Sequence, residues 1–134
     1  MTTTTWVKAA RTLIAAGTSN AAAGTTRATI DLRTSGGGLL TMKITNGGVG
    51  PTVQCTCNIL AAINDGATPA QASAGADWKT LWSFGGGVTA SVITERSFNV
   101  SKDIQHLEVE FTGNTAQAVT VEAYMSENTS ISSV

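Results

Sequence analysis

Charged residues are scarce in this sequence: they make up 13% of its 134 residues, and the formal net charge is -1 at pH 7. A protein that binds nucleic acid neutralises phosphates with lysines and arginines. An acidic membrane surface also attracts proteins through their positive charges. Here eight lysines and arginines are offset by nine acidic residues. We therefore expect neither nucleic acid nor a membrane as a partner.

Cysteine and histidine are scarcer still, with two and one residues respectively. Cys55 and Cys57 are two positions apart, so in a strand both side chains point to the same face, and a disulfide between them would be badly strained. We expect two buried free thiols. A zinc cluster of cysteine and histidine cannot be assembled from so few ligands within one chain. The sequence therefore predicts no metal and no cofactor.

Long apolar runs are also missing. The segment Met1 to Arg11 places charges where a signal peptide has its apolar core, and the uncharged run Leu13 to Ala16 is too short to serve as one. No stretch approaches the length that spans a bilayer. These patterns predict a protein that is made and assembled in a reducing cytoplasm.

Residues that could carry out catalysis are few. His106 is the only candidate imidazole base, and at the start of a strand a structural histidine is the more frequent case. Glu108 and Glu110 share one strand face at a spacing of about 7 Å, within the range of glycosidase carboxylates, but exposed alternation accounts for both. There is no Gly-x-Ser-x-Gly elbow, and the glycines at 36–38 precede a strand, which predicts a turn and not a phosphate loop. We predict no enzyme and no catalytic residue.

The clearest positive signal is alternation of apolar and polar residues between His106 and Met125. Apolar residues at every second position predict a half-buried strand, and two such runs joined by a polar turn at 113–117 predict an antiparallel hairpin. The residues predicted to face inward are Leu107, Val109, Phe111, Val119, Val121 and Ala123.

Similar runs recur along the chain at intervals of about ten to fifteen residues, separated by small-residue turns. They cover 27–34, 40–46, 52–63, 77–84 and 88–100, together with 6–16, where a helical stripe fits as well as a strand. About eight strands without helical segments between most of them predict an all-β fold, an antiparallel β-sandwich of the jelly-roll type. Residues 1–134 are then one domain. We expect residues 1–5 to be a mobile N-terminal arm or an extension of an edge strand, residues 127–134 a frayed tail, and residues 67–76 a long exposed loop suited to partner contacts.

Tryptophan supplies the candidate interaction residues. Trp78 and Trp82 fall on one face of a predicted strand, which suits either a sugar-stacking platform or a bulky wedge in the core or a subunit interface. The second interpretation is favoured, because no cluster of Asp, Asn and Gln surrounds the two rings. Trp6 follows the threonine-rich N-terminus and could anchor the chain to a neighbour or supply a third ring. Trp6, Trp78 and Trp82 are therefore the candidate interface residues.

Three segments resemble the small virion proteins of tailed bacteriophages: Thr25 to Thr34 (TTRATIDLRT), Leu40 to Gly47 (LTMKITNG) and Val109 to Thr115 (VEFTGNT). The nearest group is the capsid decoration, or cement, proteins with a jelly-roll fold. This resemblance implies a protein on the capsid surface of the virion, assembled in the host cytoplasm. It also implies that the protein binds the major capsid protein, associates with itself as a dimer or trimer, and clamps neighbouring capsomers.

Two functions thus stay open on sequence grounds. The first is a structural decoration protein that acts through contact area and many copies. The second is a carbohydrate-binding β-sandwich module that uses its tryptophans. The first predicts an oligomeric or shell-bound protein indifferent to sugars, and the second predicts a monomer whose tryptophan fluorescence responds to a glycan.

Overall fold

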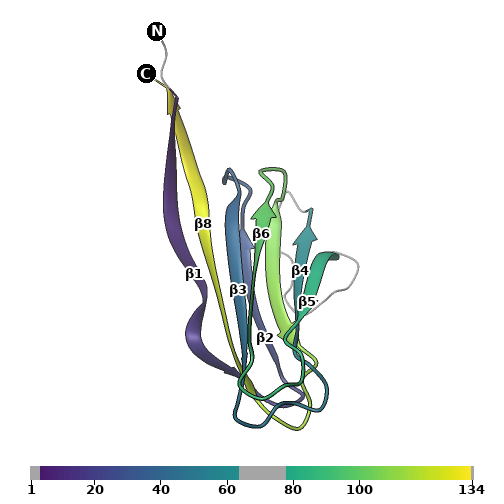
Figure 1. The fold of residues 1–134 in the computed structure, drawn as a ribbon. Coiled ribbons are helices and arrows are strands. Elements are labelled where there is room, and N and C mark those ends of the chain that lie inside the picture. The colour runs from purple at the N-terminus through teal and green to yellow at the C-terminus, as the bar shows by residue number, and fades with distance from the viewer. Residues whose placement is uncertain (1–3, 64–77, 134) are drawn as a thin grey trace.

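The computed structural model describes residues 4–63 and 78–133, and the regular structure in these residues consists of strands alone (Figure 1). The strands are β1 (Thr4–Asn20), β2 (Thr25–Asp31), β3 (Gly38–Asn46), β4 (Thr56–Ala62), β5 (Lys79–Gly85), β6 (Ile93–Val100), β7 (His106–Thr112) and β8 (Val119–Ser133). The described residues contain no helix that could cross a membrane.

The strands form two four-stranded sheets, with orders β1-β8-β3-β6 and β2-β7-β4-β5. Every pairing is antiparallel. Consecutive strands therefore alternate between the sheets for most of the chain, and the last strand returns beside the first, which is the jelly-roll arrangement. The predicted fold class is confirmed, and the ambiguous segment at 6–16 is a strand.

The core lies between the two sheets and is built from the inward positions of the alternating runs. Leu107, Val109 and Phe111 on β7 are fully buried, as the alternation predicts. They pack with the inward residues of β3 and β8, namely Leu40, Met42, Ile44, Val119, Val121, Ala123 and Met125. Cys55 and Cys57 belong to the same core, and both are free, which agrees with the predicted thiols.

A pair of buried asparagines holds the loops together at the end where β1 meets β2. The Asn114 side-chain amide donates to the main-chain oxygens of Asn20, Ala21 and Gln117 at 3.1, 3.3 and 2.9 Å. Asn20 in turn donates to Asn114 Oδ1 at 2.6 Å. Because buried loop carbonyls need such donors, these two side chains tie the β1–β2 turn to the β7–β8 loop.

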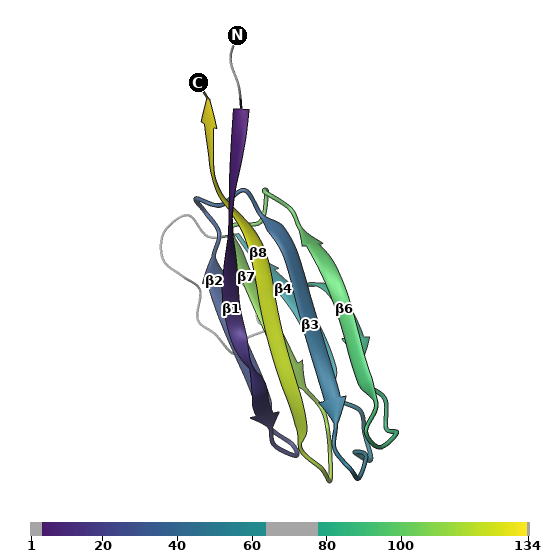
Figure 2. The ribbon, with the colours of Figure 1, turned by 60° about the vertical axis from the view of Figure 1, so that its left-hand side comes forward.

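β1 and β8 are longer than the sequence patterns suggested, and they extend past the other strands at one end of the sandwich (Figures 1 and 2). Thr4 and Thr5, expected to be part of a mobile arm, begin β1, and residues 127–133, expected to be frayed, form the second half of β8. The two segments pair with each other from Thr4 opposite Ser133 onward, so each supplies the strand partner that the other needs. Residues 1–3 and the predicted exposed loop at 67–76 lie outside the described part of the chain.

Candidate interaction surface

Trp78 and Trp82 occupy different environments in the structure. Trp78 is only 2% exposed and packs with Leu60 and Ala62 in a small cluster apart from the main core. Trp82 packs against the main core and stacks on Phe98, with ring centroids 5.9 Å apart. The expected shared face is therefore wrong, and the core interpretation holds for both rings.

The reason is an irregularity in β5 that alternation alone does not reveal. Ile59 lies opposite Trp82, whereas the next residue, Leu60, lies opposite Thr80, so β5 contains one extra residue, Leu81, at this point. Such a bulge moves the following side chains to the other face of the sheet. A sugar platform built from Trp78 and Trp82 is thereby excluded in this conformation.

Trp6 is the exposed tryptophan, with 50% of its surface accessible to solvent. A Cβ atom placed on Gly36 would lie 3.4 Å from Trp6 Cζ3 and 3.1 Å from Asn128 Cβ, so one edge of the indole rests beside these two residues. Because Gly36 has no side chain, the Trp6 ring can lie close to the loop before β3.

Trp6 belongs to a two-stranded ribbon that projects from the sandwich. β3 pairs with β8 only from Val119 to Glu127, and beyond that point the strand partner of β8 is β1. We call the residues Thr4–Lys8 and Asn128–Ser133 the ribbon. Figure 2 shows it standing clear of the remaining strands. On β1, every residue from Thr4 to Thr12 is exposed.

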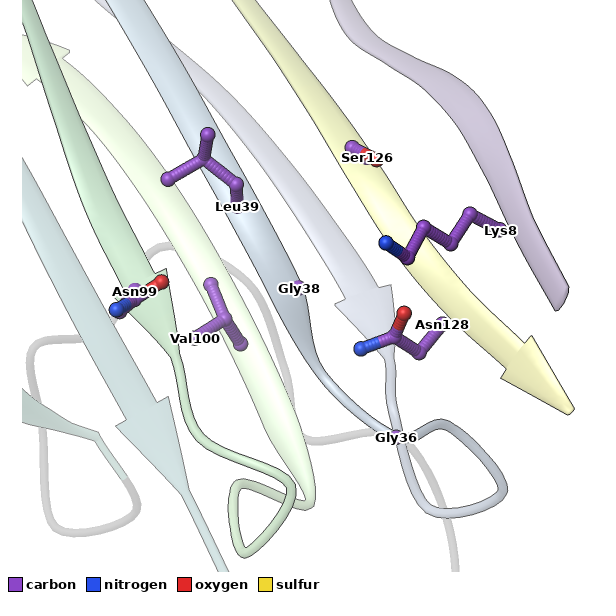
Figure 3. Close-up of a pocket in the computed structure, with 8 residues that line it drawn as sticks. All are labelled: Lys8, Gly36, Gly38, Leu39, Asn99, Val100, Ser126 and Asn128. Atoms are coloured by element: carbon purple, nitrogen blue, oxygen red, sulfur yellow. The ribbon is translucent and has the colours of Figure 1, made fainter. Parts of the chain in front are cut away.

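A pocket of about 390 Å³ lies where the ribbon joins the sandwich (Figure 3). It is lined by residues of β1, β3, β6 and β8 and of the loop before β3: Lys8, Gly36, Gly38, Leu39, Asn99, Val100, Ser126 and Asn128. Among the described residues, the Lys8 ammonium makes no ion pair and the Asn128 side-chain amide makes no hydrogen bond. A cation, two amides, a hydroxyl and two apolar side chains therefore surround this pocket.

A second pocket of about 350 Å³ shares Gly36 and Asn128 with the first. The main chain of Asn128 anchors this region, since its oxygen accepts from Gly36 N and its N–H donates to Gly37 O, each at 2.8 Å. These bonds fix the base of the ribbon against the β2–β3 loop. The ribbon therefore has a defined direction relative to the sandwich.

Glu108 and Glu110 are buried, which corrects the expectation that they are exposed. Glu108 is 0% and Glu110 is 8% exposed. Arg27 on the neighbouring strand β2 bridges them, with Nη1 at 3.4 Å from Glu108 Oε2 and 2.5 Å from Glu110 Oε2. Thr29 donates to Glu108 at 3.3 Å, and Asn58 on β4 donates to Glu110 at 2.8 Å. Each carboxylate is thus engaged by neighbouring strands, which gives both a structural role.

His106 begins the same face of β7 and is fully buried, with Nδ1 3.9 Å from Asp31 Oδ1. Hydrogen bonds from the Arg33 side chain hold the pKa of the Asp31 carboxyl well below its ordinary value. The Arg33 guanidinium lies 2.7 Å from that carboxylate. His106 therefore sits among residues that link β2 to β7. In residues 4–63 and 78–133 no group of three His, Cys, Asp or Glu side chains is arranged to hold a metal ion.

No family model and no curated protein matches this sequence. Solved structures do match its fold at low identity. The K3 cleaved adhesin domain of Lys-gingipain from Porphyromonas gingivalis is 10% identical with a TM-score of 0.51, over 87% of this chain and 71% of that domain.

Two other solved structures are similar with lower scores. The VP2 protein of an infectious bursal disease virus subviral particle is 14% identical with a TM-score of 0.49, and 91% of this chain corresponds to 32% of that protein. The C-terminal family 22 carbohydrate-binding module of Clostridium thermocellum Xyn10B is 13% identical with a TM-score of 0.45, over 92% of this chain and 86% of the module. Viral capsid proteins and carbohydrate-binding modules thus both occur among its structural neighbours. At these identities the similarity shows a β-sandwich fold and nothing about function.

Proposed function

We propose that this protein is a structural virion protein, a decoration protein that binds the major capsid protein on the outside of an icosahedral phage capsid and stabilises contacts between capsomers. The observation that carries the proposal is the projecting ribbon with the exposed stretch of β1 behind it. Trp6 and Val7, which are 50% and 44% exposed, give this stretch apolar contact area. The jelly roll beneath it is an architecture that capsid proteins use widely.

The physical basis of the proposed role is linkage. A protein that binds the assembled shell and not its separated subunits stabilises the shell by about 2.7 kcal/mol per site at a hundredfold excess over Kd. The charge-poor surface suits contact with another protein, since charged residues are depleted from the cores of protein interfaces. Repeated over many copies, a modest gain at each site resists the pressure of packaged DNA.

The test compares the heat disruption of phage particles with and without the added protein. Particles with the protein should release their DNA at a higher temperature. The variant Val7→Ser should lose much of this effect, whereas Leu81→Ser, at a residue of matched exposure on the other sheet, should retain it. Equal disruption temperatures with and without the wild-type protein would contradict the proposal.

Carbohydrate binding is the second candidate, and it is favoured by the exposed Trp6, whose ring edge lies near Gly36, one of the residues that line the pocket. An exposed indole can stack on a sugar ring, and the amides of Asn99 and Asn128 can bond to hydroxyl groups. Titration with a panel of glycans should then shift tryptophan fluorescence in the wild type and not in Trp6→Ala. A shift that persists in Trp6→Ala would place any sugar elsewhere.

A further inference from the structure

The ribbon is an incomplete piece of β-sheet. Over Thr4–Lys8, β1 has β8 as its strand partner on one edge, while its other edge is the outer edge of the sheet. A two-stranded ribbon is marginally stable in water, and the unpaired N–H and C=O groups of an edge strand can template a further strand. The exposed apolar surface of Trp6 and Val7 adds to this tendency. A third strand along β1 would complete the ribbon.

β1 lacks most of the features that protect edge strands. There is no proline between Thr4 and Thr12. The register passes from Val7 opposite Ser130 to Lys8 opposite Asn128, so the bulge lies in β8 and leaves the free edge of β1 regular. Arg11 is neutralised by Glu127 at 2.7 Å. Lys8 is then the one charge along Thr4–Thr12 that no described residue balances.

We propose that this edge pairs with β1 of a second copy of the chain, antiparallel and with Val7 opposite Val7. A two-fold axis through Val7 places Trp6 opposite the second copy's Lys8, and Lys8 opposite the second copy's Trp6. Residues directly opposite each other in an antiparallel pair lie on the same face of the sheet. Each indole then lies on the same face of the joined sheet as the second copy's ammonium group. The Lys8 side chain extends over β8 into the pocket of Figure 3 in the single copy, and on pairing it turns toward the edge of the sheet. A cation placed over the face of an indole ring is attracted to it.

The remaining pairs of this register are also compatible. Thr5 meets the second copy's Ala9, and Thr4 meets the second copy's Ala10, so small side chains lie together. At the axis, two β-branched valines face each other, which suits a strand pair. Every residue from Thr4 to Ala10 gains a partner. The pairing joins the β1-β8-β3-β6 sheet of one copy to the same sheet of the second copy and makes one continuous sheet.

Neighbouring two-fold registers are less favourable. An axis through Lys8 places the two ammonium groups directly opposite each other, and like charges in that position destabilise a strand pair. An axis through Trp6 places the two indoles opposite each other and Lys8 opposite Thr4, so neither ammonium group meets a ring. The self-complementary order of Trp6, Val7 and Lys8 is the reason to assign the edge to a second copy. Such a dimer forms whether or not the protein binds a capsid.

Cysteine cross-linking tests both the partner and the register. Val7→Cys should form a disulfide-linked dimer under mild oxidation, because directly opposite Cβ atoms lie about 4.5–5.5 Å apart. Thr5→Cys alone and Ala9→Cys alone should not cross-link, whereas an equimolar mixture of the two should. The native Cys55 and Cys57 are buried and do not interfere. Efficient cross-linking of Thr5→Cys with itself would overturn the register.

Sedimentation measures the association without any cross-link. The wild type should show a concentration-dependent dimer, and Trp6→Ala and Lys8→Ala should each weaken it by about tenfold, since each removes both symmetric ring–ammonium contacts. Lys102→Ala, at an exposed loop residue, should leave it unchanged. A wild type that is monomeric at every concentration would overturn the proposal. If the wild type is monomeric and Val7→Ser still loses the stabilisation of the capsid, the edge of β1 binds the major capsid protein and not a second copy.

Discussion

The bridge formed by Arg27 provides a sharp test of the structure. Replacing Arg27 by methionine keeps most of the side-chain bulk on β2 and removes the positive charge that faces Glu108 and Glu110. The two carboxylates are then left buried, with Thr29 and Asn58 as their remaining hydrogen-bond donors. An uncompensated buried charge is among the most destabilising changes a single substitution can make.

The expected loss in the free energy of unfolding follows from the burial of Arg27, Glu108 and Glu110. Breaking a buried ion pair by removing one partner costs about 3–5 kcal/mol. The Arg27 side chain is 22% exposed, so water reaches part of the site, and we expect the lower end, about 3 kcal/mol. With a urea m-value of about 2 kcal/mol/M, the unfolding midpoint falls by about 1.5 M.

Urea unfolding at pH 7, followed by tryptophan fluorescence, measures this shift. Arg33→Met is the matched control, because its partner Asp31 is an exposed neighbour in sequence, and a surface pair contributes about 0–1 kcal/mol. Adding Glu110→Gln to Arg27→Met should recover part of the loss, since it removes one buried charge. Equal midpoints for Arg27→Met and Arg33→Met, or no recovery in the double variant, would refute the reasoning.

Two further predictions concern the core and the base of the ribbon. Burial raises the pKa of the Cys55 thiol to about 11, from an ordinary value of 9.0, and raises the pKa of Cys57 as well. Both thiols should resist alkylation until urea unfolds the chain. The folded state holds these protons more tightly than the unfolded state, so the stabilisation that they provide is fully present below pH 9. The free energy of unfolding should fall as the pH rises from 9 toward 11, and it should fall less in Cys55→Ala. Gly38→Ala should destabilise the protein in urea far more than Gly48→Ala, because a Cβ on Gly38 would lie 1.9 Å from the main-chain oxygen of Ser126, whereas one on Gly48 meets nothing within 4 Å.

Much of the fold could be predicted because a strand between two layers repeats every two residues. Leu107, Val109 and Phe111 have to share a face, and that face has to be covered, so alternation alone places them in the core. About eight such runs, separated by turns at regular spacing, predict a jelly roll without any information on which strands pair. The same argument placed Cys55 and Cys57 together inside, where the structure has them.

The candidate site was only partly predictable. Trp6 was identified from the sequence as a possible contact residue, and its exposure in the structure is compatible with that role. The sequence left Thr4 and Thr5 open between a mobile arm and an edge extension, and it did not indicate their pairing with the residues after Glu127, because these polar segments carry no apolar alternation. A polar segment is ordered here by the backbone hydrogen bonds of a partner strand more than a hundred residues away in sequence. The signal that could have found it is the high strand propensity of threonine at the N-terminal end.

The sequence by itself determined which residues alternate, and hence the all-β class, the core positions and the free thiols, because these depend on local periodicity. Only the tertiary structure decided that Glu108 and Glu110 are buried, since a carboxylate on the outer side of a strand is exposed unless other strands bring Arg27 and Asn58 to it. It also decided that Trp78 and Trp82 separate, because one inserted residue in β5 is defined by its pairing with β4. Burial of polar groups and the register of strands are properties of neighbours that are distant in sequence, and the order of residues along one strand does not contain them.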